Sequence, residues 1–60
     1  MNKTEFGITI KSTGNPGVYR VSGKINGIRK KVMLVQPIFA VQLGMEPTID
    51  QAIDALNNAA

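Results

Sequence analysis

Alternation of apolar and polar positions is clearest between Val18 and Val35, where two alternating runs flank an Asn26-Gly27 pair. Asn-Gly between such runs is typical of a β-hairpin with a type I′ turn, because both central positions need a positive φ. Placing Ile25 opposite Ile28 sets the register, and the expected pairs are then Val21 with Val32, Tyr19 with Leu34, and Gly23 with Lys30. The opposite face carries Arg20, Ser22, Lys24, Arg29, Lys31 and Met33. The pattern therefore predicts a hairpin with one apolar face and one basic face.

Another alternating run precedes the hairpin, from Glu5 to Lys11, and it predicts a half-buried strand. The residues expected on its apolar side are Phe6, Ile8 and Ile10. Thr9 and Lys11 are expected to join the basic face. Turn-forming residues fill positions 12–17, and Gly17 can take the positive φ of a type II turn. This strand and the two strands of the hairpin together predict a three-stranded antiparallel meander.

Lys30 is the residue that fits this register least well, because it falls on the apolar side. One account lets its aliphatic stem lie over the space left by Gly23, with the ammonium group at the sheet edge. The other account is a β-bulge that turns Lys30 outward.

Residues 37–44 carry mixed signals. Pro37 at a helix start and Gly44 just beyond the end favour a short helix. Ile38, Phe39 and Val41 instead prefer strands, so an extra strand, added to the sheet of a partner, stays open. We favour the short helix.

The C-terminal segment predicts a helix that begins after Thr48. Thr48 and Gln51 have the spacing of a capping box, and Asp50 in the first turn suits the helix dipole. The apolar stripe at helical spacing consists of Ile49, Ala52, Ile53, Leu56 and Ala60. The predicted fold is therefore an α+β single domain over residues 1–60, with a three-stranded antiparallel sheet packed by a C-terminal helix.

Composition argues against catalysis. The 60 residues include no Cys and no His, and the four carboxylates are scattered, so no nucleophile and base stand at a useful spacing. We expect a protein that is not an enzyme and has no metal site and no cofactor. A chain of this size buries only about 60% of its unfolded surface, and with no cross-link available we expect a homo-oligomer.

No apolar run approaches the roughly 20 residues of a membrane span, and the N-terminal residues lack a signal-peptide pattern. We therefore expect a soluble, cytoplasmic protein with no membrane partner.

Charge is divided along the chain. All seven Lys and Arg residues precede position 36, and three of the four carboxylates follow it. The candidate anion-binding residues are Lys11, Arg20, Lys24, Arg29 and Lys31. A two-stranded ribbon with such a face can enter a DNA major groove. The competing interpretation is that these cations only solvate an exposed sheet face and discourage aggregation.

The "GKINGIRKK" hairpin, with strands before it and a helix over positions 48–58, resembles the N-terminal arm-binding domains of phage-type integrases. That resemblance implies that a three-stranded sheet backed by one helix lies in the major groove. It also implies groove contacts by Arg20, Lys24, Arg29 and Lys31.

The alternative to a DNA-binding function is that of an inhibitor or a nucleotide-sequestering protein. A small phage-type accessory or anti-defence protein of this size would inhibit a host protein, or would sequester a small anionic nucleotide between the basic faces of an oligomer.

Overall fold

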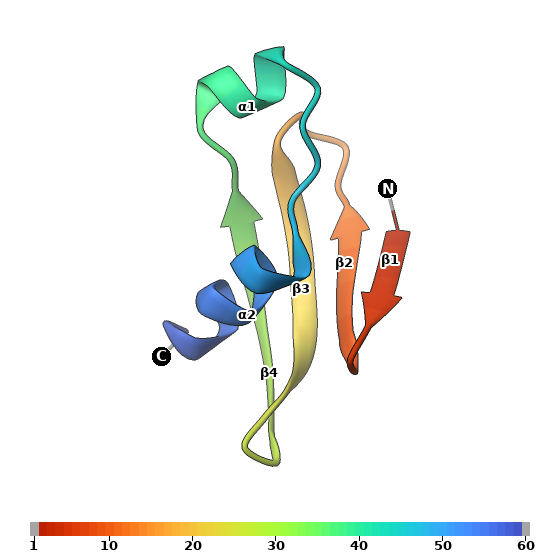
Figure 1. Ribbon diagram of the computed structural model, residues 1–60, viewed down its shortest axis with the longest axis vertical. Helices are drawn as coiled ribbons and strands as arrows, with labels where there is room; N and C mark the ends of the chain where they lie inside the picture. The colour runs from red at the N-terminus through yellow and green to blue at the C-terminus, as the bar shows by residue number, and fades with distance from the viewer. Residues whose placement is uncertain (1, 60) are drawn as a thin grey trace.

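The computed structural model describes residues 2–59 and contains one sheet and two helices (Figure 1). The elements in chain order are β1 (Asn2–Glu5), β2 (Ile8–Ser12), β3 (Val18–Ile25), β4 (Ile28–Val35), α1 (Ile38–Gln42) and α2 (Ile49–Asn57). The four strands are antiparallel and follow one another in the order β1-β2-β3-β4. The predicted α+β class is confirmed, but the predicted count of three strands is wrong by one.

The central hairpin has the register expected from its Asn26-Gly27 turn. Ile25 pairs with Ile28, and the pairing continues without interruption to Val18 and Val35. Both turn residues have positive φ, 52° at Asn26 and 80° at Gly27. A type I′ turn and strict alternation therefore suffice to align two strands of eight residues each.

The extra strand arises because the run from Glu5 to Lys11 is two strands and not one. Phe6 and Gly7 have φ values of 52° and 73°, and Glu5 pairs with Ile8, so a second two-residue turn interrupts the run. Phe6 was expected among the apolar residues that face the core, yet it lies in this turn with 88% of its surface exposed. Ile8 and Ile10 are buried, as expected.

The connection between β2 and β3 is a tight turn around Pro16. The backbone N–H of Val18 donates to the Asn15 carbonyl at 3.2 Å, and Gly17 has a φ of 75°, as a type II turn requires. Gly17 also accepts a backbone hydrogen bond from Gln36 at 2.8 Å. The chain leaving β4 is thereby tied to the start of β3.

Helix α1 resolves the mixed signals of residues 37–44 in favour of the short helix. Pro37 stands at the N-cap, one residue earlier than the first helical position, and Gly44 follows the C-cap with a φ of 70°. Val41 lies directly over Gly17, where a Cβ atom would clash with its side chain. The helix therefore rests on the β2–β3 turn at one end of the sheet (Figure 1).

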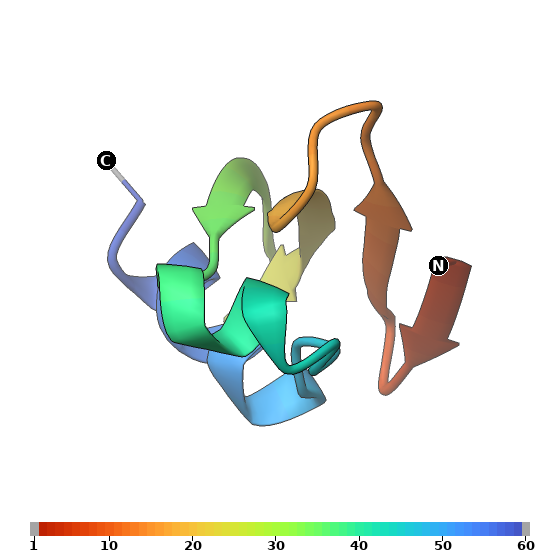
Figure 2. The same cartoon turned by 90° about the horizontal axis from the view of Figure 1, so that it is seen from above.

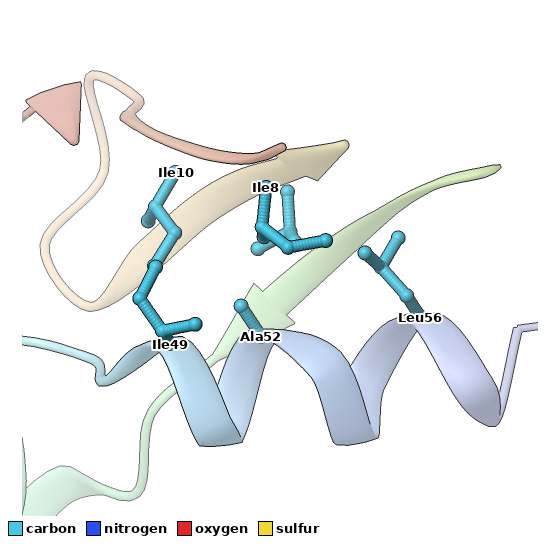
Figure 3. Close-up of a cluster of buried hydrophobic side chains, with 6 residues drawn as sticks. Ile8, Ile10, Ile49, Ala52 and Leu56 are labelled. Carbon is cyan, nitrogen blue, oxygen red and sulfur yellow. The ribbon is translucent and has the colours of Figure 1, made fainter. Parts of the chain in front are cut away.

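Helix α2 covers one face of the sheet, and the other face is uncovered (Figures 1 and 2). Its start is the predicted capping box: the Thr48 hydroxyl accepts from the Gln51 N–H at 3.2 Å, and the Gln51 side chain accepts from the Thr48 N–H at 2.9 Å. Figure 3 shows its apolar side chains pointing toward those of β2. The buried cluster consists of Ile8, Ile10, Val21, Ile49, Ala52 and Leu56. The predicted stripe is thus confirmed through Leu56, and Ala60 lies outside the described residues.

Lys30 keeps its place on the apolar side, opposite Gly23, and is half-buried. The uninterrupted pairing rules out the bulge. The space over Gly23 is nevertheless filled by Ile8, whose Cδ1 atom would lie 2.5 Å from a Cβ added there. The lysine stem therefore does not occupy that space, which corrects the first account as well.

Candidate nucleic-acid interface

The uncovered face of the sheet gathers all five candidate residues. Strand pairing places Lys11 beside Arg20, and Lys24 beside Arg29. Between these two pairs, Ser22 pairs with Lys31 on one side and with Thr9 on the other. We call this surface the cation face and define it by Lys11, Arg20, Lys24, Arg29 and Lys31.

Each of these five side chains is exposed, and none is neutralised by a neighbour. Among residues 2–59 no carboxylate lies within ion-pair distance of a lysine or arginine. The four carboxylates all lie away from the cation face. Glu5 pairs with the buried Ile8 and so projects from the helix-covered side, Glu46 precedes α2, and Asp50 and Asp54 are exposed on α2. Five of the seven Lys and Arg residues therefore lie on the uncovered face of the sheet, away from every carboxylate.

The centre of the cation face is slightly hollowed. A shallow, open concavity of about 490 Å³ lies there, and its lining includes Lys11, Arg20, Ser22, Lys31 and Met33. Met33 pairs with Arg20 and has 51% of its surface exposed, so it adds an apolar contact to the cations. The hollow therefore offers charge, a hydroxyl and an apolar group at one place.

The chemistry of this surface suits an anion with planar or apolar groups beside it. Arginine presents a rigid fork of donors that matches phosphate oxygens or the edge of a guanine, whereas lysine acts as a mobile point charge. The hydroxyls of Ser22 and Thr9 can donate to further oxygens. The single Tyr on the sheet, Tyr19, is half-buried against the core cluster and does not lie on this face.

Other kinds of site are not found in the described part of the chain. Residues 2–59 contain no group of three or more metal-ligating side chains, and no buried side-chain polar atom there lacks a partner. Neither α1 nor α2 is long and apolar enough to span a bilayer.

Phe6 is the residue near this surface that the sequence pattern misplaced. Its turn precedes β2 and packs against β3, where a Cβ added to Gly23, the residue before Lys24, would lie 3.0 Å from the Gly7 carbonyl oxygen. The signal that could have found it is the Phe-Gly pair itself, because glycine at the second position is what a type I′ turn needs.

Comparisons with protein-family models, with curated protein sequences and with solved structures found no match to this chain.

Proposed function

We propose that this chain is a small, non-enzymatic protein that binds duplex DNA through the cation face. The observation that carries the proposal is the separation of charge among residues 2–59, where one face of the sheet holds five exposed cations and no carboxylate. A face that only needed solvation would be served by mixed charges, which avoid a single-sign field. Concentrated positive charge is the electrostatic footprint of nucleic-acid binding.

The shape of the sheet also favours a duplex. Neighbouring strands lie about 4.8 Å apart, so the β3–β4 hairpin is narrow enough for a major groove about 12 Å wide. Helix α2 packs on the opposite side and leaves the groove-facing surface clear (Figure 2). The order of β2, β3, β4 and α2 is the one that the resemblance to integrase arm-binding domains implies.

A single-stranded ligand has less support. Proteins that bind single strands usually stack successive bases on aromatic side chains within a basic groove. Among the described residues, no aromatic side chain lines the hollow at Arg20 and Lys31.

The test is charge reversal at two arginines, Arg20→Glu together with Arg29→Glu. We expect at least a 100-fold loss of affinity for a short fluorescent duplex, since each arginine that meets a base or phosphate contributes on the order of 1–3 kcal/mol. For the unaltered chain, the logarithm of the association constant should fall with the logarithm of salt concentration at a slope of about −4 to −5 if all five cations meet phosphates. Fluorescence anisotropy at several salt concentrations measures both quantities.

The matched control is Lys3→Glu together with Lys30→Glu. It changes the net charge by the same amount but on the helix-covered side, because Lys3 pairs with the buried Ile10 and Lys30 with Gly23. This control should retain nearly all of the affinity at physiological salt. Equal losses in the two double variants would show that net charge alone drives binding, and an unchanged Arg20/Arg29 variant would contradict the proposal.

A second candidate ligand is a small anionic nucleotide held in the hollow between Lys11, Arg20 and Lys31. The volume of about 490 Å³ is sufficient for such a molecule, although the hollow is shallow and open. The two ligands are distinguished by calorimetry and thermal shift. A nucleotide that saturates with fixed stoichiometry and raises the melting temperature, in a protein with no duplex affinity, would favour the second candidate.

We also propose that the chain acts as a homo-oligomer that assembles through its uncharged end. Large exposed apolar side chains concentrate over residues 35–45, a stretch with no charged residue, and they are Val35, Ile38, Phe39, Leu43 and Met45. Two cation faces would repel each other, so the uncharged end is the surface that a second copy can approach. The expected result is a mass above that of one chain at micromolar concentration, with a return to monomer on Leu43→Lys. A wild-type chain that stays monomeric in analytical ultracentrifugation would contradict this assembly.

A further inference from the structure

Two turns of this protein have similar φ values and end in Gly, but they differ at the first position. Phe6 and Gly7 have φ values of 52° and 73°, and Asn26 and Gly27 have 52° and 80°. Each turn joins paired neighbours, Glu5 with Ile8 and Ile25 with Ile28. Asn tolerates the left-handed region because its short polar side chain bonds locally, whereas a bulky residue there is unusual.

Phe6 is unfavourable at its position in a second respect. With 88% of its surface exposed, the ring takes no part in the core cluster of residues 8, 10, 21, 49, 52 and 56. The core therefore does not require Phe6 to hold its left-handed φ. Strain of this kind at a bulky residue is explained by a contact with something outside the chain.

The position of the turn indicates what that contact is. The pairing of β2 with β3 ends at Thr9 and Ser22, and Lys24, two residues beyond Ser22, pairs with Arg29. The turn nevertheless packs against β3, because a Cβ added to Gly23 would lie 3.0 Å from the Gly7 carbonyl oxygen. The turn that holds Phe6 therefore lies against the residue next to Lys24, at the end of the cation face formed by Lys24 and Arg29. Glu5, the adjacent carboxylate, projects from the other side of the sheet.

We infer that Phe6 is a DNA-contacting residue, whose ring packs against a deoxyribose or a base edge where the duplex leaves the cation face. This inference rests on the function proposed above. An aromatic ring makes apolar contact with sugar carbons and with the thymine methyl group, and neither contact involves a phosphate. Phe6 would thus add affinity that does not depend on salt, beside the cations, whose contribution does.

The test is Phe6→Asn, which installs the residue found in the matching turn. We expect the affinity for the short duplex to fall about tenfold, the lower end of what burial of a phenylalanine ring against apolar groups contributes. The salt slope should stay that of the wild-type chain, because every phosphate contact is kept. The melting temperature of the free protein should not fall, so weaker binding cannot be attributed to a damaged fold.

Two further variants make the result specific. Ile28→Thr removes an apolar side chain that is also exposed, 62%, but projects from the helix-covered side, because Ile28 pairs with the partly buried Ile25. It lies outside both the cation face and the uncharged end, so it should leave duplex affinity unchanged. Phe6→Trp keeps an aromatic ring and should bind as well as the wild type.

The outcomes separate this inference from the proposed function. Wild-type affinity in Phe6→Asn, alongside a large loss in the Arg20/Arg29 variant, would overturn the role of Phe6 and leave the cation face intact. Equal losses in Phe6→Asn and Ile28→Thr, or a changed salt slope, would also overturn it. Unchanged affinity in the Arg20/Arg29 variant would remove the proposed function first.

Discussion

The two type I′ turns show how the same local geometry has different importance in different places. Asn26-Gly27 joins strands of eight residues, β3 and β4, whose inner side chains pack under α2. Phe6-Gly7 joins the four-residue edge strand β1 to β2. At the central turn the residues follow conformational preference, because misalignment there would displace the core side chains of β3 and β4. At the edge turn the preference is broken, and the fold tolerates this because only β1 depends on it.

The largest effect on stability is expected from Gly23→Ala, because Gly23 lies where the two hairpins are in contact. A Cβ there would lie 2.5 Å from Ile8 Cδ1 and 3.0 Å from the Gly7 carbonyl oxygen, so the Ile8 side chain has to leave its place in the core and the edge turn has to shift slightly. We expect a loss of about 1–3 kcal/mol in the free energy of unfolding, since overpacking a well-filled site has that cost. Urea denaturation followed by circular dichroism measures it. Wild-type stability would show that Ile8 does not fill the space over Gly23.

The next effect comes from the paired substitutions Gly27→Ala and Gly7→Ala. An added Cβ meets no atom within 4 Å at either position, so the two differ only in what their turns support. Gly27→Ala should cost about 1–2 kcal/mol of global stability, because a left-handed Ala is strained in the hairpin that organises the core.

Gly7→Ala should introduce the same backbone strain at the edge turn. We expect β1 to detach from the sheet and relieve this strain without unfolding the rest of the protein. Hydrogen exchange should then show weaker protection at residues 2–5 with little change in the melting temperature. Equal global losses in the two variants would contradict the view that the edge turn is dispensable.

The smallest effect is expected from exchanging the residues at the first turn position. Phe6→Asn should raise stability by a few tenths to about 1 kcal/mol, and Asn26→Phe should lower it by a similar amount, because Asn tolerates the left-handed region better than Phe does. In a chain of this size 1 kcal/mol corresponds to roughly 4–8 °C in melting temperature, so thermal denaturation resolves both changes. A Phe6→Asn protein less stable than the wild type would show that the ring has a structural role.

Local sequence rules predicted the structure correctly wherever a few neighbouring residues determine the backbone conformation. Asn26-Gly27 specified the central hairpin and its register, and the pair Thr48 and Gln51 specified the start of α2. The alternation of cations with small polar residues on β2, β3 and β4 likewise predicted which side chains share the uncovered face. These features depend on neighbours within a few positions or directly across a hairpin, so the sequence alone determines them.

The remaining features were decided by tertiary contacts. Residues 5–11 alternate as one strand would, and only the pairing of Glu5 with Ile8 in a continuous sheet divides them and leaves Phe6 outside the core. The short helix at residues 38–42 forms where Val41 packs over Gly17, and Ile8 of the neighbouring strand β2 covers Gly23. The hydrophobic pattern describes each segment separately. The free energy gained by burying a side chain depends on which other segments pack against it.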